Sequence, residues 1–471
     1  MIISIPLGKA RMLSFPPGIS RGLFQLHERV LGRPTFDYLQ GLERTQSLSR
    51  NDIKALQLKR LRQLLRTALD HSPWHSERIK DTGINPALFT WESFRQLPCM
   101  TKDDARVHGD KMVWREAPGG VFRYNTGGSS GEPLIFYFGR KRQAVDAACR
   151  MRARRWWGIN PGDREVLLWG APVELKRTDH IKQVRDRLCN QLLLNAFEMS
   201  GSRMDHYLDL LEVYQPNCIY GYASSLALLA EHAEKNGRRP AINSLKVICT
   251  TGEPLYPHQR EIIGRIFNAP LSNEYGARDA GLIALESPQK QMLVNSEWMI
   301  VEILDDDGNP VEEGETGEIV ITNLASEAQP FIRYRTGDMG TWSDERCRMG
   351  HGLEVLQEVT GRTTDFIVKP DGTIMHALAL IYVVRETPGV KRFKIIQQDP
   401  ERIVVQIIKD STQWNEANMT RIRQGIKKRV GEIVMVNIEI VENIPTEASG
   451  KYRYVVRHDF NNKEIYNKQI L

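Results

Sequence analysis

The residues with the most evident chemical potential form one short segment, Tyr124-Asn125-Thr126-Gly127-Gly128-Ser129-Ser130-Gly131-Glu132-Pro133, between two runs typical of strands. Glycine lets the backbone take positive φ and approach a ligand closely. Consecutive glycines and serines therefore direct several N–H groups and hydroxyls into one concavity, which suits a phosphate. The segment is not a P-loop, because no Gly-Lys-Ser/Thr closes it and an extended run follows where that motif needs a helix. Alone, it is more typical of a hairpin turn.

Alternating strands and helices follow and would position further polar loops. The expected strands are Val166–Trp169, Cys218–Tyr220 and Val247–Thr250, and the expected helices are 203–214, Ser224–Asn236 and His258–Phe267. This alternation indicates an α/β sandwich with parallel strands. Open α/β sheets bind ligands in the loops that follow such strands. Two candidate loops are Thr251-Gly252-Glu253-Pro254 and Asn273-Glu274-Tyr275-Gly276.

The pattern then becomes rich in strands over residues 298–342. Ile300–Leu304 and Glu318–Thr322 flank an Asp-Asp-Asp-Gly-Asn turn that predicts a hairpin. We interpret the three adjacent aspartates as a solvated loop rather than a metal site. Past Gly361 the pattern changes to ββαβ: Phe393–Gln398, Arg402–Lys409, a helix over Trp414–Val430, and Val434–Val441. We expect residues 1–362 to form a large domain and residues 365–471 a small one.

A strongly basic stretch with a helical pattern runs from Gly139 to Trp157. Its cations would attract coenzyme A phosphates or an acidic carrier protein, but a solvated helix face is the stronger interpretation. Regularly spaced aromatic platforms are absent from the sequence, so nucleic acid is not an expected partner. Residues 1–50 show little periodicity and indicate an arm packed on the main body. A helix is expected from Ile53 until His71-Ser72-Pro73-Trp74, where the proline ends it.

Composition is that of an ordinary globular protein of two or three domains, with 471 residues, 41% hydrophobic and 26% charged. Neither a membrane-spanning run nor a signal-peptide pattern is present in the sequence. The six cysteines are widely spaced and form no Cys-x-x-Cys pair, which predicts a reducing, cytoplasmic location. A net charge of +6 permits an anionic ligand without requiring nucleic acid.

Five motifs occur in an order that is more informative than any of them alone. They are Gly-Gly-Ser-Ser-Gly at 127–131, Glu-Tyr-Gly at 274–276, Tyr-Arg-Thr-Gly-Asp at 334–338, Gly-Arg at 361–362 and Ser-Gly-Lys at 449–451. In this order they resemble the core motifs of adenylate-forming enzymes. Stretches such as Tyr275-Gly276-Ala277-Arg278-Asp279 make the chain most similar to the phenylacetate–CoA ligase branch, and within it to relatives encoded in capsule and polysaccharide clusters.

This resemblance implies a two-step reaction in which a carboxylate attacks the α-phosphorus of ATP and an acceptor then takes the acyl group. It implies that Thr126, Gly127, Gly128, Ser129, Ser130 and Gly131 hold the β,γ-phosphates, and that Tyr275 and Gly276 lie at the adenine with Gly252 and Glu253 along the same pocket. Asp338 would bind the ribose hydroxyls, an ionised carboxylate's task. Arg362 would add a fixed positive charge. Lys451 would neutralise charge that develops during adenylation. Mg²⁺ would take one protein carboxylate, for which Asp279 is the candidate.

The chain departs from the family pattern in places. Arg278-Asp279 replaces the usual Thr-Glu, and Thr364 occupies the position of the hinge acid, with Asp365 next. Domain rotation around residues 363–365 is still expected, because hinges tolerate varied residues. Some relatives in the branch carry a cysteine-rich zinc site; Glu286-Ser287 stands there instead, so zinc is not expected.

The sequence therefore predicts an ATP-dependent acid ligase whose most probable acceptor is coenzyme A. A carrier protein, an amine or a sugar hydroxyl is an alternative acyl acceptor. A second alternative is transfer of AMP itself to a hydroxyl-bearing acceptor. A third is a catalytically silent nucleotide-binding partner. The acid is not identified. Trp169, Tyr222 and Thr250 are expected to line its pocket, and their mixed aromatic and small character would suit an aryl or medium-length acyl group.

Overall fold

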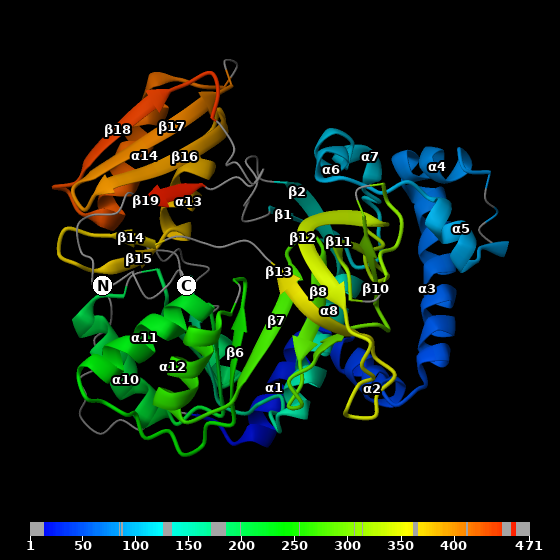
Figure 1. The fold of residues 1–471 in the computed structure, drawn as a ribbon, viewed down its shortest axis with the longest axis horizontal. Coiled ribbons are helices and arrows are strands. Elements are labelled where there is room, and N and C mark those ends of the chain that lie inside the picture. Colours follow the sequence, from blue (N-terminus) through cyan, green and yellow to red (C-terminus); the bar gives the residue numbers. More distant parts are fainter. Residues whose placement is uncertain are drawn as a thin grey trace.

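The computed structural model describes residues 14–83, 85, 88–125, 134–170, 185–197, 199–253, 255–305, 307–312, 314–360, 366–410, 413–444 and 454–457. One large mixed sheet organises these residues (Figure 1). Its parallel strands are β4 (Gln191–Asn195), β3 (Glu165–Trp169), β5 (Cys218–Gly221), β6 (Val247–Thr251) and β7 (Leu271–Ala277). Apolar residues of β3, β5 and β6 are largely buried, as in other parallel sheets, whereas the edge strand β4 exposes Leu193.

The same sheet continues beyond β7 with antiparallel strands. In spatial order these are β8 (Gly281–Glu286), β9 (Met292–Val294), β13 (Val355–Thr360), β12 (Tyr334–Trp342), β11 (Thr316–Asn323) and β10 (Met299–Leu304). The strand-rich region expected from the sequence is thus hydrogen-bonded to the parallel part through β7 and β8. The hairpin expected around residues 305–309 is confirmed by the antiparallel pairing of β10 with β11.

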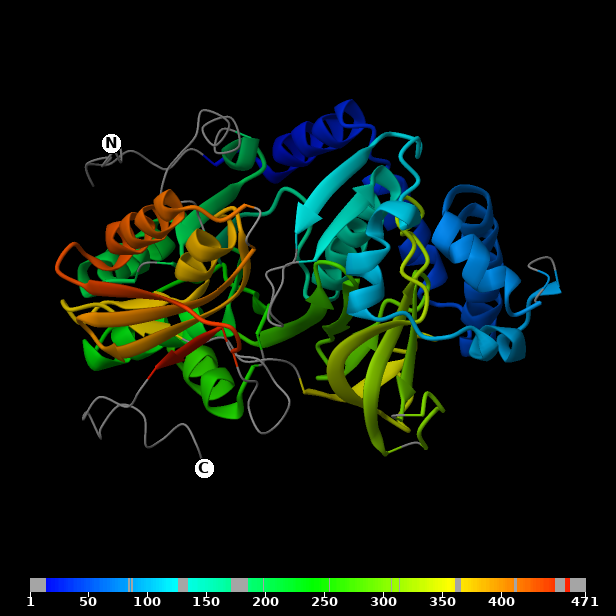
Figure 2. The same ribbon diagram turned by 90° about the horizontal axis from the view of Figure 1, so that it is seen from above.

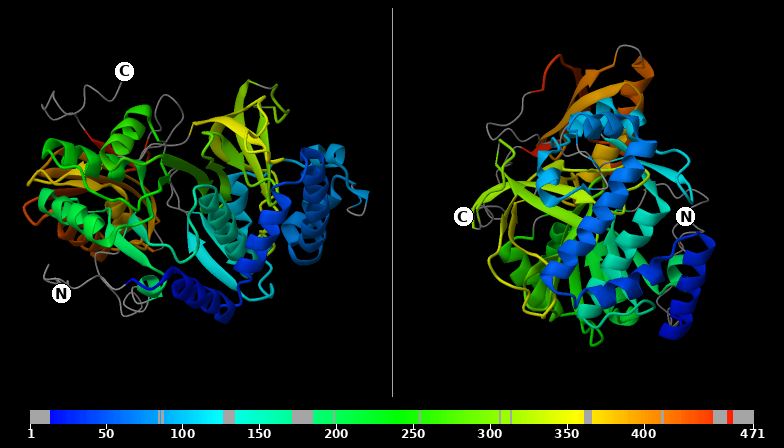
Figure 3. Two further views of the ribbon diagram at one scale, coloured as in Figure 1. Left: turned by 90° about the horizontal axis from the view of Figure 1, so that it is seen from below. Right: turned by 90° about the vertical axis from the view of Figure 1, so that its right-hand side faces the viewer.

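Helices cover the faces of this sheet. They are α1 (Pro17–Val30), α2 (Thr35–Thr45), α3 (Arg50–His71), α4 (Pro73–Lys80), α5 (Trp91–Gln96), α6 (Lys102–Val107), α7 (Gly109–Met112), α8 (Arg140–Trp156), α10 (Gly201–Tyr214), α11 (Ala223–Lys235) and α12 (Pro257–Phe267). The long helix α3 runs along the outside of the molecule on the side shown at the right of Figure 3. It ends at His71, before the proline, as the sequence predicts. Among the described helices, none is long and apolar enough to cross a membrane.

A four-stranded sheet follows the large one in the sequence. It has the order β18 (Met435–Ile440), β17 (Arg402–Lys409), β16 (Val390–Asp399) and β19 (Val455–Arg457). Helices α13 (Leu378–Arg385) and α14 (Glu416–Val430) and the hairpin of β14 (Phe366–Val368) with β15 (Ile374–His376) complete this C-terminal unit. Seen from above, it lies over the side of the molecule that carries α10–α12 (Figure 2). One continuous cluster of buried apolar side chains contains residues of both parts, including Leu226 and Leu380.

Two expectations about the N-terminal half are wrong. Residues 14–50 do not lack periodicity but contain the amphipathic helices α1 and α2, whose helical spacing was obscured by nearby breakers such as Pro16-Pro17-Gly18 and Pro34. Helix α8 does not present its cations to solvent. Arg142 and Arg152 are buried to 0% and 1% exposure, and Arg154 is ion-paired to Glu165 on β3. Burial of charge is tolerated here because each cation has a carboxylate beside it.

Candidate active site

Two of the predicted nucleotide-binding residues meet where β7 and β12 approach each other. The hydroxyl of Tyr275 donates a hydrogen bond to Oδ2 of Asp338 at 3.1 Å. Tyr275 is partly buried and its ring packs against the apolar core of the antiparallel strands. Asp338 is partly buried as well. The pair therefore combines an aromatic ring with a carboxylate at the edge of solvent, as a nucleoside site requires.

Irregular pairing of β12 with β11 shapes the backbone at Asp338. The register shifts between Glu318 and Val320, and Glu318 Oε1 accepts a hydrogen bond from the N–H of Gly337 at 3.0 Å. The Thr336 hydroxyl donates to the Ile319 carbonyl at 2.7 Å and accepts from the N–H of Asp338 at 3.1 Å. A bulge of this kind redirects side chains at a site. The Tyr-Arg-Thr-Gly-Asp motif thus holds Asp338 through its own threonine.

The ionisation of Tyr275 follows from this environment. Burial raises the pKa of its phenol well above the usual value, and the neighbouring Asp338 carboxylate raises it further. Tyr275 therefore stays neutral near pH 7 and acts as a hydrogen-bond donor.

Asp279, the predicted magnesium ligand, lies in the turn between β7 and β8 and is 5% exposed. Its Oδ2 accepts a hydrogen bond from the hydroxyl of Tyr334 at 2.7 Å, and its Oδ1 accepts one from the N–H of Ala280 at 3.1 Å. The guanidinium of Arg142 donates to the Arg278 carbonyl at 2.8 Å, one residue before Asp279. Asp279 therefore ties this turn to the first residue of β12. Within the described residues, no group of three or more His, Cys, Asp or Glu side chains suits a metal ion.

The turn that carries Arg278 also reaches the start of the glycine-rich segment. The guanidinium of Arg278 donates to the carbonyl of Asn125, the last residue of β1 (Val121–Asn125), at 3.4 Å. Strand β1 pairs in an antiparallel manner with β2 (Ile135–Gly139), which confirms the two strands expected to flank the segment. Thr126–Gly131 itself lies outside the described residues, as do Arg362 and Lys451. The contact nevertheless brings one end of the segment beside the Tyr275 loop.

The loop after β6 holds Gly252 and Glu253. Gly252 has φ of +77°, which favours glycine, and a Cβ there would lie 3.2 Å from the ring of Tyr222. Glu253 Oε2 accepts hydrogen bonds from the backbone N–H of Ser224, at 3.1 Å, and from the Ser224 hydroxyl. The carboxylate of Glu253 therefore lies at the N-terminus of α11, where the helix dipole favours a negative charge. Gly276 is also required by packing, because a Cβ there would lie 2.6 Å from the carbonyl oxygen of Gly281.

The three predicted acid-pocket residues lie close together at the carboxyl ends of the parallel strands. The rings of Trp169 and Tyr222 stack with centroids 4.3 Å apart. Thr250 is fully buried and its hydroxyl donates to Oδ1 of Asn273 at 3.1 Å. Phe197, which the sequence did not single out, packs against Gly170, where a Cβ would lie 1.9 Å from its ring. Phe197 also faces the C-terminal unit, where the ring of Tyr382 on α13 lies 6.1 Å away, centroid to centroid.

Sequence reasoning also missed a polar cluster beneath this site. Glu274 accepts hydrogen bonds from Arg150 at 3.1 Å and from the hydroxyl of Tyr220 at 2.8 Å. Glu274 precedes Tyr275 directly, so the cluster fixes the strand that carries the candidate adenine-binding ring. The basic pattern of α8 was the available signal, since cations on a helix beside a sheet need carboxylate partners when they are buried.

Comparison with known proteins gives matches to both parts of the chain. A family described as AMP-binding enzyme matches residues 195–325, and the CapK C-terminal domain matches residues 367–458. Protein CapK of Staphylococcus aureus is 22% identical over 429 residues, which cover 90% of this chain and 93% of that protein. The phenylacetate-coenzyme A ligase of Thermus thermophilus is 24% identical over 441 residues, covering 87% and 98%. A solved structure of 2-hydroxyisobutyryl-CoA ligase with 2-HIB-AMP and CoA has the same fold, with a TM-score of 0.58, 21% identity and coverage of 88% and 91%.

The mixed sheet with its C-terminal four-stranded unit, and these matches, define the class of protein: an adenylate-forming enzyme. The matched CapK C-terminal domain and the phenylacetate-coenzyme A ligase relatives support a place for the chain in the phenylacetate–CoA ligase-like branch of that superfamily, near CapK.

Proposed function

We propose that this protein uses ATP to activate a carboxylic acid as an acyl-adenylate, with release of pyrophosphate, and then transfers the acyl group to coenzyme A. The observation that carries the proposal is the hydrogen bond between Tyr275 and Asp338, because it joins two of the five ordered motifs at one solvent edge. The contact of Arg278 with Asn125 supports it, since it brings the end of the glycine-rich segment to the same edge.

In this proposal the ring of Tyr275 stacks on adenine with Gly276, Gly252 and Glu253 nearby, and Asp338 accepts hydrogen bonds from the ribose. The N–H and hydroxyl groups of Thr126–Gly131 hold the β,γ-phosphates. Arg362 contributes a fixed charge near the α-phosphate. Lys451 neutralises the negative charge that develops as the carboxylate attacks, an electrostatic role in the transition state.

The proposed division of labour follows the two parts of the chain. Residues 1–362 would bind ATP and the acid, and residues 365–471 would form a lid that delivers Lys451 and rotates about residues 363–365. Rotation would replace Lys451 by an entry path for the thiol. The match of the CapK C-terminal domain to residues 367–458 supports a boundary close to residue 365.

Asp279 is the candidate for Mg²⁺, which when bound would screen the phosphate oxygens. Each of its carboxylate oxygens already accepts one hydrogen bond, so an ion would use a remaining lone pair. Such a site fits Mg²⁺, because this ion commonly takes one or two protein carboxylates and keeps several waters.

The acid would lie against Trp169 and Tyr222, with Thr250 behind them. Stacking of the two rings supports an aryl or medium-length acyl group, since a flat apolar wall favours a ligand of that kind. Both ATP and coenzyme A are cytoplasmic metabolites, so we place the reaction in the cytoplasm.

Other acceptors than coenzyme A are alternatives within this proposal. A carrier protein, an amine or a sugar hydroxyl would fit relatives from capsule and polysaccharide clusters. The remaining alternatives are transfer of AMP to a hydroxyl-bearing acceptor and a nucleotide-binding protein that catalyses neither reaction.

Exchange of labelled pyrophosphate into ATP, measured against a panel of carboxylic acids, separates these readings. Acid-dependent exchange supports the ligase. Transfer of AMP to a hydroxyl compound without any acid supports the adenylylation alternative, and absence of both reactions supports a silent nucleotide-binding protein. ATP consumption with and without coenzyme A then tests the acceptor.

A further inference from the structure

Helix α1 packs on the protein through polar residues and leaves apolar residues outside. Its buried residues are Ser20 and Glu28. By contrast, Ile19, Leu26 and Val30 are 54%, 58% and 77% exposed. A surface helix ordinarily does the reverse and turns its apolar side chains toward the core. An exposed apolar face of this kind is typical of a surface that binds a partner.

The exposed apolar residues lie on a single face of α1. Ile19, the partly buried Leu23, Leu26 and Val30 are separated by four, three and four positions, so their side chains form one apolar stripe along the helix. The 14 residues of α1 make a helix about 21 Å long, and the stripe covers most of it. Helix α1, in dark blue, lies at the edge of the molecule in Figure 2, where a broad, flat partner can reach it.

Polar contacts at both ends hold α1 in this orientation. Just before the helix, the buried side chain of Asn190 accepts a hydrogen bond from the N–H of Phe15 and donates one to its carbonyl, both at 2.9 Å. Near the other end, the carboxylate of Glu28 accepts hydrogen bonds from Arg33 and from the hydroxyl of Thr35. Attachment of α1 to the rest of the protein therefore does not require the apolar stripe.

The charge around the stripe is positive. Residues 1–27 contain Lys9, Arg11 and Arg21 but no aspartate or glutamate. The first acidic residue in the sequence is Glu28, which is buried. Arg29 is exposed and lies beside the stripe, three positions after one of its leucines. A partner with negative charge would therefore meet cations and no exposed carboxylate of α1.

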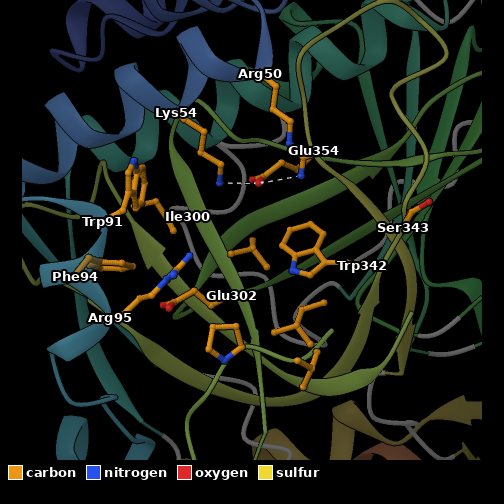
Figure 4. Close-up of a pocket in the computed structure, with 14 residues that line it drawn as sticks. Arg50, Lys54, Trp91, Phe94, Arg95, Ile300, Glu302, Trp342, Ser343 and Glu354 are labelled. Atoms are coloured by element: carbon orange, nitrogen blue, oxygen red, sulfur yellow. Dashed lines mark ion pairs between the residues drawn. The ribbon is translucent and has the colours of Figure 1, made fainter. Parts of the chain in front are cut away.

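Other cations of the N-terminal half are paired with carboxylates. In a cavity of about 240 Å³ between α3, α5 and β10 (Figure 4), Nζ of Lys54 lies 2.7 Å from Glu354. Such pairing weakens the attraction of a cation for a distant anion. Within the described residues, neither Arg21 nor Arg29 forms an ion pair, so both contribute fully to the positive field around α1.

Area and charge together favour a lipid surface over a second copy of the chain. Two α1 helices, each about 21 Å long and about 10 Å wide, would bury roughly 200 Å² on each side, whereas stable interfaces bury about 800 Å² per partner. A two-fold interface would also bring Arg29 of each copy toward like charges. An anionic bilayer surface accepts apolar side chains and attracts cations at the same time.

We propose that α1 is an interfacial helix that attaches the protein to an anionic phospholipid surface. Ile19, Leu26 and Val30 would enter the boundary between headgroups and acyl chains, and Arg29 would stay at the level of the headgroups and pair with lipid phosphate. The helix would lie in the plane of the surface without spanning the bilayer. The proposal needs no residue of the nucleotide site, so it does not depend on the proposed function.

The test is co-sedimentation of the full chain with vesicles of phosphatidylglycerol and phosphatidylcholine in equal parts, and with vesicles of phosphatidylcholine alone. We expect stronger binding to the anionic vesicles. Leu26→Gln combined with Val30→Gln should weaken this binding about tenfold or more, because two apolar side chains no longer leave water. Arg29→Gln should weaken it about fivefold, the contribution of one cation near an anionic surface. All three side chains are exposed, so the variants should fold normally, which urea denaturation checks.

Matched variants on other helices locate the binding. Val107→Gln replaces a valine of 75% exposure on α6, and Arg66→Gln replaces an exposed arginine on α3. Both should bind anionic vesicles as the wild type does. If Val107→Gln weakened binding as much as Val30→Gln, general surface hydrophobicity would be responsible and the proposal would be overturned.

Three other results would also overturn the proposal. The first is absence of binding of the wild type to anionic vesicles, and the second is equal binding to both kinds of vesicle. The third is a dimer in solution, seen by analytical ultracentrifugation, that Val30→Gln dissociates while vesicle binding is absent. That result would assign the apolar stripe of α1 to a second copy of the chain.

Discussion

The phenol oxygen of Tyr275 lies 3.1 Å from Oδ2 of Asp338, although 63 positions separate the two residues in the sequence. Strands β8, β9 and β13 lie between β7 and β12 in the order of the sheet, so the hydrogen bond requires the sheet to curl until these two strands approach each other. A neutral phenol fixes the carboxylate, and the carboxylate in turn keeps the phenol protonated. The pair would therefore present the ring and the carboxylate to a nucleoside in a fixed relative position, which lowers the ordering cost of binding.

Removal of the carboxylate should weaken nucleotide binding. Asp338→Ala deletes the proposed acceptor for the ribose hydroxyls, and hydrogen bonds to charged groups contribute about 1.5–3 kcal/mol. We expect the Kd for ATP, measured by titration calorimetry, to rise about tenfold or more. Asp344→Ala, an exposed aspartate just after β12, is the control and should bind ATP normally. Unchanged affinity in Asp338→Ala would remove the ribose role.

Lys451 should serve only the first half-reaction. Lys451→Ala is expected to abolish pyrophosphate exchange and to spare thioester formation from supplied acyl-adenylate, because the proposed cation acts while charge develops on the α-phosphate. The two half-reactions can be assayed separately with the same preparation. Equal loss of both would contradict the proposed division of labour between the two orientations of the lid.

The buried pair of Arg152 with Glu297 should be the most sensitive structural contact of α8. The guanidinium lies 2.5 Å from Glu297 Oε1 and donates to Asn295 Oδ1 at 2.9 Å. Arg152→Met leaves the carboxylate buried without its cation, which typically costs about 3–5 kcal/mol of unfolding free energy. Arg115→Met breaks a solvent-exposed pair with Asp110 and should cost less than about 1 kcal/mol. Urea denaturation measures the free energy of unfolding of both variants. Equal losses in Arg152→Met and Arg115→Met would show that burial of the ion pair does not determine its contribution.

Much of the α/β part could be predicted because its signals are local. Strands β3, β5 and β6 are short apolar runs, and a helical pattern follows each of them before the next predicted strand. Strand β4 was missed, because its sequence Gln191-Leu192-Leu193-Leu194-Asn195 contains none of the β-branched or aromatic residues that favour strands. Helices α1 and α2 were missed because the prolines and glycines around them, such as Pro16-Pro17-Gly18 and Pro34, are typical of breaks in a helical pattern.

The site could be predicted by motif order but not by geometry. No local pattern indicates that Tyr275 bonds to Asp338, or that Asp279 bonds to Tyr334, since both contacts depend on how the antiparallel strands pack. The misjudged cations of α8 show the same limit. Their carboxylate partners Glu165, Glu274 and Glu297 lie up to 145 positions away, and a charge pattern in one dimension does not reveal them.

His75 should make the protein less stable in mild acid. Burial and the nearby Arg78 lower the pKa of its imidazole from 6.5 to about 3, and its Nε2 is 2.9 Å from the Pro330 carbonyl. Because the pKa of His75 is lower in the folded than in the unfolded protein, protons bind the unfolded chain preferentially between these two values. The free energy of unfolding is therefore unaffected by His75 above pH 6.5 and falls as pH decreases from 6.5 toward 3. The slope should be about 1.4 kcal/mol per pH unit. His75→Gln keeps a donor for Pro330 but does not titrate, so urea denaturation between pH 7 and pH 5 should show a flatter slope. An identical slope in the variant would assign the acid sensitivity to other groups.

Tyr382 should control how the C-terminal unit docks on the candidate acid pocket. Its ring lies 6.1 Å from that of Phe197, centroid to centroid, and the guanidinium of Arg385 lies 4.9 Å from it on the same helix. Tyr382→Ala removes the aromatic contact between the two parts of the chain. We expect amide hydrogen exchange in residues 378–385 to accelerate about tenfold for each 1.4 kcal/mol of docking energy lost.

The exchange pattern distinguishes undocking from unfolding of the unit. Strands β16 and β17 pair with each other inside the C-terminal unit, so their amides should stay protected in Tyr382→Ala if only docking is lost. Met435→Ala, on an exposed position of β18 with 66% exposure, should leave exchange unchanged throughout. Parallel acceleration in β16, β17 and α13 would instead mean that Tyr382 supports the core of its own unit. The proposed lid rotation requires the first pattern, because a lid that leaves the acid pocket must separate Tyr382 from Phe197 without losing its own sheet.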